Sequence, residues 1–368
     1  MRQAATQTLA ISPYLIVFVL YASMVEVGIL NYQKALVQYA GYNAWMAIPI
    51  TGIGMHLVIW MIYRICSSNG GTDVIEINQR YFGSWIGRAL NAAIVCYFAF
   101  GAFITFRVYL ALIQYMLFPE INLVFISAII AILLYYTVSG GFRSIAGLCF
   151  WGVLCSFAFV VPLNLLGLNY LHPQNLFPLW NHSAAEQLLS AKSMVFSFTG
   201  IETLLIYYPF IQTPEKSKKW AHWTVLLVTV YYLITALLTF MYYSEGQLQK
   251  VIWPTLHRVA LIKLPLIQRV EYLVISILLV KIMASIALGL WSACRGAKYS
   301  LRMNQPVALM LFLSGFLIVV AFVKNEIMIK QMADFYASVG FYFLFAYIPF
   351  LFVLTLFKKT PSRNYTKE

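Results

Sequence analysis

Apolar residues run along this chain in long blocks, and the polar residues gather in the short segments between them. The blocks are about 20 residues long or longer, which is the length an α-helix needs to cross roughly 30 Å of hydrocarbon. The first block exceeds one span, so we expect a break within it. The pattern predicts an all-α membrane protein with about ten spanning helices, at residues 9–39, 41–65, 86–117, 121–139, 145–170, 187–211, 219–243, 268–294, 306–323 and 331–357.

The composition also indicates a protein embedded in a lipid bilayer. Hydrophobic residues make up 62% of the 368 residues and charged residues only 10%, and the mean hydropathy is +0.79. A soluble globular chain has about 25% charged residues. The net charge of +13 does not indicate nucleic-acid binding, because the basic residues are scattered over short loops. We expect these basic residues to contact the headgroups of the lipid bilayer, and we do not expect nucleic acid as a partner.

The distribution of basic residues predicts the orientation. An even number of spans places both termini on one side of the membrane. About fifteen Lys and Arg residues fall in segments on that side and about eight on the other, so the positive-inside rule predicts cytoplasmic termini. Residues 358–368 then form a short basic cytoplasmic tail.

Four charged residues fall well inside the apolar blocks, namely Glu26, Arg107, Glu202 and Lys281. Each costs about 2.5–3.5 kcal/mol at the centre of a spanning helix. Two are acidic and two are basic, as in a set that is paired in the protein interior. We expect them to converge on a polar cavity in which Glu202 has at least one basic partner. The alternative for Glu26 is that it reaches outward to the membrane interface.

Glycine accompanies both acidic residues. The first span reads MVEVGILNY, with Gly28 beside Glu26, and the sixth reads FSFTGIETLL, with Gly200 beside Glu202. In a chain of ten spans, the first and the sixth begin the two halves. Glycine in corresponding segments of two halves points to discontinuous helices in a transporter built from inverted repeats.

A helix broken at mid-membrane frees amide and carbonyl groups that lipid cannot satisfy, so the break must line a cavity. A small zwitterion would satisfy these groups, its carboxylate at a half-helix N-terminus and its ammonium at freed carbonyls or a carboxylate. We therefore predict a small polar ligand at mid-membrane. The whole chain is expected to form one transmembrane domain of two inverted five-helix repeats, at about 9–170 and about 187–357.

Other site chemistry is not indicated. His56 lies alone in the second span, and no histidine pair has the spacing of metal ligands. No nucleophile elbow, phosphate-binding glycine loop or zinc-protease helix occurs. We predict no enzyme activity, no cofactor and no metal.

Several segments together resemble the spore germination permeases, the B-type membrane subunits of germinant receptors in endospore-forming bacteria. That family belongs to the amino acid–polyamine–organocation transporter superfamily, which has the leucine-transporter fold. The resemblance covers nearly the whole chain, and its most specific parts are FTGIE, IWPT and QRVE in this order. The segments are VGILNYQKAL, YNAWMAIPI, FGSWIGRALN, RVYLALIQYMLFPE, FSFTGIETLLIYYPFI followed by PEKSKKW, and VIWPTLHRVALIKLPLIQRVEYLVISILLV.

The resemblance implies an amino acid or a similar small nutrient bound among spans one, three, six and eight, the spans that hold the four internal charges. It also implies an A-type membrane subunit and a C-type lipoprotein as partners. The expected location is the spore inner membrane or the cell membrane of an endospore-forming bacterium. The candidate substrate-binding residues are Glu26, Val27, Gly28, Arg107, Phe198, Thr199, Gly200, Glu202 and Lys281.

Two positions depart from the family pattern, which commonly has a second glycine at Glu26 and a proline at Gln33. Glu26 would fill space that a ligand carboxylate needs, so the ligand is cationic or the site is altered. Three functions stay open: recognition of a germinant, proton-coupled transport of an amino acid, and a scaffold role with a vestigial pocket. The coupling ion stays open as well.

Overall fold

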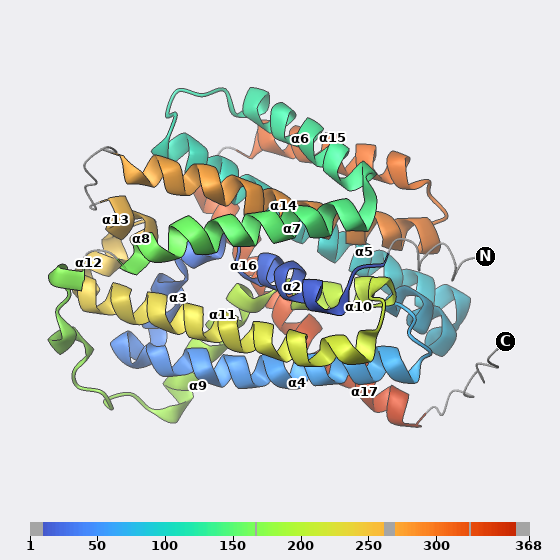
Figure 1. The fold of residues 1–368 in the computed structure, drawn as a ribbon, viewed down its shortest axis with the longest axis horizontal. Coiled ribbons are helices and arrows are strands. Elements are labelled where there is room, and N and C mark those ends of the chain that lie inside the picture. The colour runs from blue at the N-terminus through green and yellow to red at the C-terminus, as the bar shows by residue number, and fades with distance from the viewer. Residues whose placement is uncertain (1–9, 166–167, 261–268, 324, 358–368) are drawn as a thin grey trace.

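The computed structural model describes residues 10–165, 168–260, 269–323 and 325–357. The regular elements of this part of the chain are all helices, and the prediction of an all-α fold is confirmed. Figure 1 shows the long helices lying side by side along the long axis of the molecule. The predicted basic tail at 358–368 lies outside the described residues.

The helices follow the apolar blocks, with short 3-10 and π segments at the breaks and bends. The α-helices are α2 Ile16–Met24, α3 Tyr32–Ala40, α4 Ala47–Ser68, α5 Val74–Met116, α6 Leu123–Ser139, α7 Gly141–Cys155, α8 Val161–Leu165, α9 Ala184–Met194, α10 Leu204–Tyr207, α11 Pro214–Tyr242, α12 Glu245–Lys250, α13 Pro254–Ala260, α14 Val270–Ser300, α15 Gln305–Phe322, α16 Glu326–Tyr342 and α17 Ile348–Phe357. The short segments are η1 Pro13–Leu15, η2 Val27–Leu30, η3 Gly41–Met46, η4 Ser156–Val160, η5 Leu168–Tyr170, η6 Pro173–Leu176, η7 Val195–Phe198, η8 Ile201–Thr203, η9 Tyr208–Phe210 and η10 Phe343–Tyr347.

The number of spans is roughly consistent with ten. Within the described residues, 7 helices are long and apolar enough to cross a membrane, and 8 if the bent pair Ala184–Phe198 and Ile201–Phe210 is one span. Two spans are missing from this count: the first, whose initial half Pro13–Met24 is short and whose second half α3 is counted with α4, and α6, which is apolar but has only 17 residues.

The segment before the third span forms a helical piece of its own. Helix α5 begins at Val74 and is divided by a sharp bend at Gly83, whose φ is 76°, so its spanning part begins close to the predicted residue 86. Glycine adopts this left-handed value without steric cost. The first turns fold back, so that Asn78 donates a hydrogen bond of 2.9 Å to Asn91 on the spanning part.

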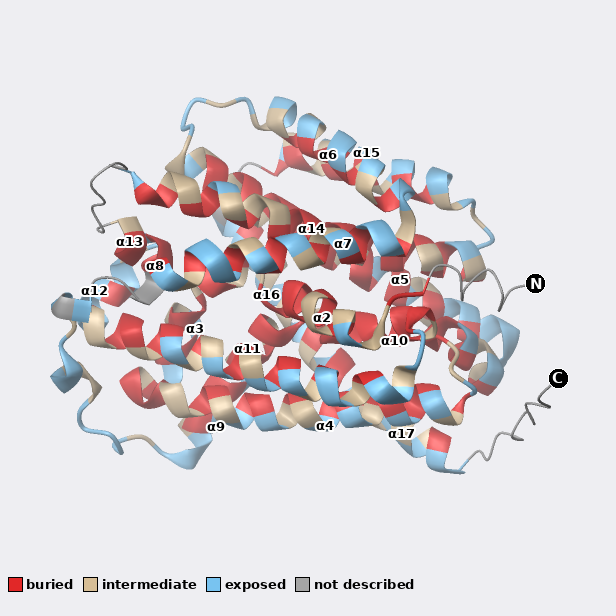
Figure 2. Cartoon of the chain, viewed as in Figure 1, coloured by how far each residue is buried: buried red, intermediate tan, exposed pale blue. Residues whose placement is uncertain are grey.

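The centre of the bundle is formed by α5 and α14, which pack against each other. In the most apolar stretch of each of these two helices 67% is buried inside the protein, compared with 28% in the corresponding stretch of α15. Figure 2 shows exposed residues along the outer sides of α6 and α15. Since Ile132 on α6 and Phe322 on α15 are large, apolar and exposed, these helices present their outer sides to lipid.

The first and sixth spans meet at one end of the molecule. The Ile11 amide donates to the Phe210 carbonyl at 2.8 Å, and the Gln212 amide donates to the Ile11 carbonyl at 3.0 Å. This pair of backbone hydrogen bonds ties the start of the first span to the end of the sixth. The two predicted discontinuous helices therefore run together through the bundle.

Candidate functional site

The first span is interrupted after Met24, where α2 ends. Val25 has φ −96° and ψ 86°, and Glu26 has φ −104° and ψ −156°, so two consecutive residues leave the helical conformation. The chain resumes with the short segment η2 and then α3. The predicted break in the first span is confirmed, and it contains Glu26, Val27 and Gly28 as expected.

Glu26 points into the bundle rather than toward the membrane interface. Its carboxylate accepts a hydrogen bond of 2.6 Å from the hydroxyl of Thr105 on α5 and another from the hydroxyl of Ser285 on α14. The two central helices therefore satisfy the acidic group at the break. The alternative that Glu26 reaches outward to the interface does not apply.

The sixth span is interrupted between Phe198 and Ile201. Thr199 is extended, with φ −58° and ψ 152°, and Gly200 has φ 102°. The helical segments on either side are bent by 51° relative to each other. The predicted break in the sixth span is confirmed, and only glycine adopts a φ in this range without strain.

Glu202 closes this break from within its own segment. Its two carboxylate oxygens accept from the Gly200 amide at 2.9 Å and 3.0 Å, and one of them also accepts from the Tyr97 hydroxyl at 2.7 Å. The side chain is completely buried. Glu202 therefore accepts the hydrogen bond from the free amide that was expected to bind a ligand carboxylate.

The expected basic partner of Glu202 is absent from the described part of the chain. The ion pairs there join Arg80 to Glu76, His182 to Glu186, Arg269 to Glu271 and Arg295 to Asp73. A tyrosine hydroxyl and a backbone amide take the place of a cation at Glu202. Neutral donors can satisfy a buried carboxylate by hydrogen bonding. A charged residue inside a span therefore does not by itself show that its partner carries the opposite charge.

The two breaks touch each other. A Cβ atom at Gly200 would overlap the carbonyl oxygen of Ser23 and lie 2.8 Å from its carbonyl carbon. Gly28 differs, because a Cβ atom there would meet nothing within 4 Å. The glycine of the sixth span is thus needed for close approach to the first span, whereas the glycine of the first span is not.

Tyr232 on α11 links the two breaks. Its hydroxyl lies 3.1 Å from the Met24 carbonyl, at the end of α2, and 3.0 Å from the Ser197 carbonyl, just before the break in the sixth span. One buried donor thus serves a freed carbonyl of each interrupted helix. The sequence analysis missed this residue, because a tyrosine inside an apolar block has the same local signature as a packing or interface aromatic.

Replacing Tyr232 with Phe is expected to destabilise the protein by about 1–3 kcal/mol, because two buried carbonyls lose their shared donor while the ring stays in place. Thermal unfolding of the purified chain in detergent measures the effect. Tyr136→Phe is the matched control, since Tyr136 is 80% exposed on α6. Equal melting temperatures for the two variants would contradict the bridging role of Tyr232.

The other candidate binding residues predicted from the sequence do not all lie at the two breaks. Phe198 is buried, with its ring centroid 5.5 Å from that of Tyr232. The Thr199 hydroxyl donates to the Phe196 carbonyl at 2.7 Å. Arg107 does not join the breaks, and it donates from two nitrogens to the Val323 carbonyl, at 3.1 Å and 3.2 Å, just after α15. The prediction that all four internal charges converge is therefore wrong for Arg107.

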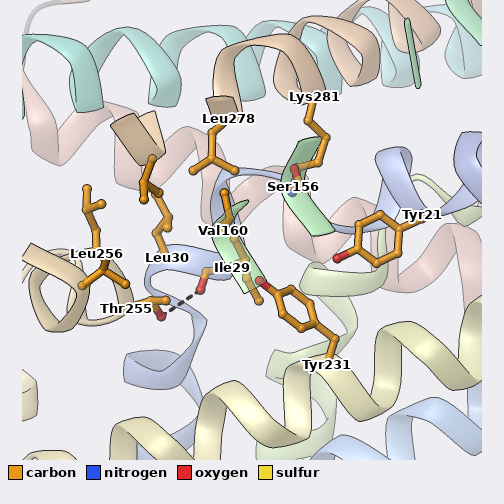
Figure 3. A pocket seen from close by; sticks show the side chains of 12 residues that line it. Tyr21, Ile29, Leu30, Ser156, Val160, Tyr231, Thr255, Leu256, Leu278 and Lys281 are labelled. Carbon is orange, nitrogen blue, oxygen red and sulfur yellow. Dashed lines mark hydrogen bonds between the residues drawn. The ribbon is translucent and has the colours of Figure 1, made fainter. Parts of the chain in front are cut away.

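Lys281 on α14 lines a small cavity beside the first break, shown in Figure 3. The cavity has a volume of about 10 Å³, room for about one water molecule. The hydroxyls of Tyr21 and Tyr231 border it together with Lys281, and Leu256 and Leu278 border it from the other side. Lys281 lies near enough to Glu26 for their charges to interact, although the two do not form an ion pair.

His56, the histidine of the second span, lies beside a histidine of another helix. Its Nδ1 atom lies 2.9 Å from Nδ1 of His222 on α11, and the two rings stack with centroids 5.2 Å apart. The two residues are far apart in sequence, so their spacing gave no signal. Within the described ranges, no group of three or more His, Cys, Asp or Glu side chains is placed to hold a metal ion.

Comparison with known proteins places these features in a family. A family model described as spore germination protein matches residues 10–329. The chain is 33% identical to the spore germination protein GerQB of Bacillus cereus over 348 residues, covering 94% of this chain and 95% of GerQB. It is 21% identical to the spore germination protein YndE of Bacillus subtilis, covering 90% of this chain and 92% of YndE.

A solved structure shares the fold. A substrate-bound, outward-open Na⁺-coupled sialic acid symporter superposes with a TM-score of 0.60 at 12% identity, covering 94% of this chain and 76% of the symporter. This likeness confirms the predicted leucine-transporter fold and carries no information on the ligand. The breaks in spans one and six, the transporter fold and the family match agree, and the chain belongs to the spore germination permease family of integral membrane proteins.

Proposed function

We propose that this chain is the ligand-recognising subunit of a spore germinant receptor, and that it binds a small amino-acid-like nutrient at mid-membrane. The observation that carries the proposal is the pair of adjacent helix breaks, in a chain of this family, next to a cavity bordered by Lys281. The proposed binding residues are those at the two breaks together with Lys281. Arg107 is not among them.

The germination proteins that resemble this chain favour the receptor role. We propose that it acts with an A-type membrane subunit and a C-type lipoprotein, in the spore inner membrane, with cytoplasmic termini. The fold is shared with a Na⁺-coupled symporter, and this favours transport of the ligand as the second candidate function. A cavity with room for one water is compatible with a closed state of either.

A thermal-shift screen of the purified chain against amino acids, nucleosides and sugars tests the proposal. Binding of a ligand to the folded state raises the melting temperature. Protection by one class of nutrient is the expected result, and protection by none of them would favour a scaffold with a vestigial pocket. Co-purification with A-type and C-type subunits supports the receptor, and uptake of the radiolabelled nutrient into proteoliposomes supports the carrier.

Glu202→Gln locates the site within the chain. We expect the variant to insert normally and to require about tenfold more ligand for the same response, because the charge that organises the Gly200 amide and the Tyr97 hydroxyl is lost. The control is Glu186→Gln, which alters an exposed glutamate at the start of the same span. Identical dose responses in wild type and Glu202→Gln would remove the site from the sixth span.

A further inference from the structure

We propose that Lys281, with the hydroxyls of Tyr21 and Tyr231, forms a subsite for the carboxylate of the recognised molecule. The inference rests on the proposed function and specifies its ligand: a small aliphatic molecule with a carboxylate group. It also assigns that carboxylate to α14, rather than to the amides of the broken helices where the sequence analysis placed it.

The Lys281 ammonium is buried without an acceptor in the described part of the chain. The residue is only 2% exposed, and its Nζ atom makes no hydrogen bond to any described residue. Its nearest aromatic contact is the ring of Tyr21, whose centroid is 5.9 Å from Nζ. Since a buried ammonium without an acceptor is costly, a site of this kind is completed by an anion.

Two tyrosine hydroxyls point into the same cavity as Lys281. Tyr21 on α2 and Tyr231 on α11 border the same cavity, and neither hydroxyl hydrogen-bonds to a described residue. Figure 3 shows both hydroxyls directed toward the interior of the cavity. Ser156 and Thr255 line the cavity as well, but their hydroxyls donate to the Gly152 and Ile29 carbonyls, so Lys281 and the two tyrosines supply the remaining donors. This set of donors matches an acceptor-only group such as a carboxylate.

The internal carboxylates have other partners than Lys281. Glu202 is held by the Gly200 amide and Tyr97, and Glu26 by Thr105 and Ser285. The amide at the sixth-span break is therefore already in use, and a ligand carboxylate would compete with Glu202 for it. The donors at Lys281 have no such competitor. The charge of Glu26, which acts on Lys281 through space, would favour an ammonium group on the same ligand.

The remaining walls define the rest of the molecule. Leu30, Leu256 and Leu278 lie on the side of the cavity away from the tyrosine hydroxyls. An aliphatic group packs against such walls, whereas a sugar or a purine would leave its polar edges unsatisfied there. The cavity holds about one water in the closed conformation, so these apolar walls move apart when the larger molecule binds.

The test compares L-leucine with L-leucinamide, which has the same shape and ammonium group but no carboxylate. Binding to the purified full-length chain is measured by thermal protection and by equilibrium dialysis. We expect L-leucine to raise the melting temperature, and we expect L-leucinamide to bind about a hundredfold more weakly. A third probe, 4-methylpentanoate, retains the carboxylate and is expected to compete with L-leucine.

Variants assign the effect to the subsite. Lys281→Met is expected to weaken L-leucine binding about a hundredfold and to abolish the discrimination between acid and amide, and Lys281→Arg is expected to retain part of it. Lys250→Met, at an exposed lysine on α12, is the control and should leave binding unchanged. If Lys281→Met does not fold, Tyr231→Phe removes a single donor and is expected to weaken binding about tenfold.

The outcomes separate this inference from the function on which it rests. The carboxylate subsite is overturned if L-leucine and L-leucinamide bind with equal affinity. It is also overturned if a nucleoside or sugar protects the chain equally in wild type and Lys281→Met. Either result would leave the proposed role as a ligand-binding subunit intact. Chloride is compared with gluconate as the buffer anion. If chloride raises the melting temperature and competes with L-leucine, the subsite holds an inorganic anion and the carboxylate assignment is overturned. Protection by no compound of the screen would count against both proposals.

Discussion

Gly200→Ala is expected to destabilise the protein by about 2–6 kcal/mol, the largest effect of any single methyl group at the site. Two costs add. The φ of 102° is strained for any residue with a side chain, at about 1–3 kcal/mol, and the new methyl group overlaps the Ser23 carbonyl, which costs about as much again. Because the obstacle is the backbone of α2, a change of rotamer cannot relieve it. Thermal unfolding in detergent measures the loss.

Gly28→Ala is the matched control for this prediction. The two glycines have the same sequence context, each two residues from a glutamate in a broken span, yet Gly28 has open space at the Cβ position. Alanine at Gly28 should change the melting temperature by little. If both variants unfold at the same temperature, the close contact between the two breaks is not what Gly200 provides.

The second large effect is expected at the ion pair between Asp73 and Arg295. Two nitrogens of Arg295, on α14, donate to one oxygen of Asp73 at 2.8 Å and 3.1 Å, and the side chains are only 15% and 8% exposed. Asp73 also caps α5, since its other oxygen accepts from the Glu76 amide at 3.1 Å. Asp73→Asn keeps the cap and removes the charge. It is expected to cost about 3 kcal/mol, because Arg295 is left buried without its counter-charge.

A double-substitution cycle checks the origin of this cost. Adding Arg295→Met to Asp73→Asn should recover part of the stability, because the uncompensated charge is then gone. The comparison pair is Arg80 and Glu76, which are 36% and 49% exposed. Glu76→Gln should cost no more than about 0.5 kcal/mol. Additive effects of the Asp73 and Arg295 substitutions would show that the two charges do not stabilise each other.

The spans and the two breaks could be predicted from the sequence because their signals are local. A long apolar block and a glycine beside a buried glutamate are each contained in a few consecutive residues. The fold followed from their order along the chain. The predicted start of the third span at 86 lies close to the bend at Gly83, whereas the contact between Asn78 and Asn91 depends on packing rather than on local hydrophobicity.

The partners of the buried charges could not be predicted in the same way. Tyr97 and Thr105 serve the two glutamates from another span, and nothing in their own segment distinguishes them from other polar residues in spanning helices. Counting charges also misplaced Arg107, which donates from two nitrogens to a backbone carbonyl just after α15. A balanced number of internal charges therefore did not mean that they are paired with one another.

The single hydroxyl of Tyr232 has a consequence for motion in this protein. The carbonyls of Met24 and Ser197 depend on one proton donor carried by a third helix, α11. Displacing either interrupted span by itself would leave a buried carbonyl without its donor. The least costly rearrangement is a rigid-body swing in which α2, the first half of the sixth span and α11 travel together.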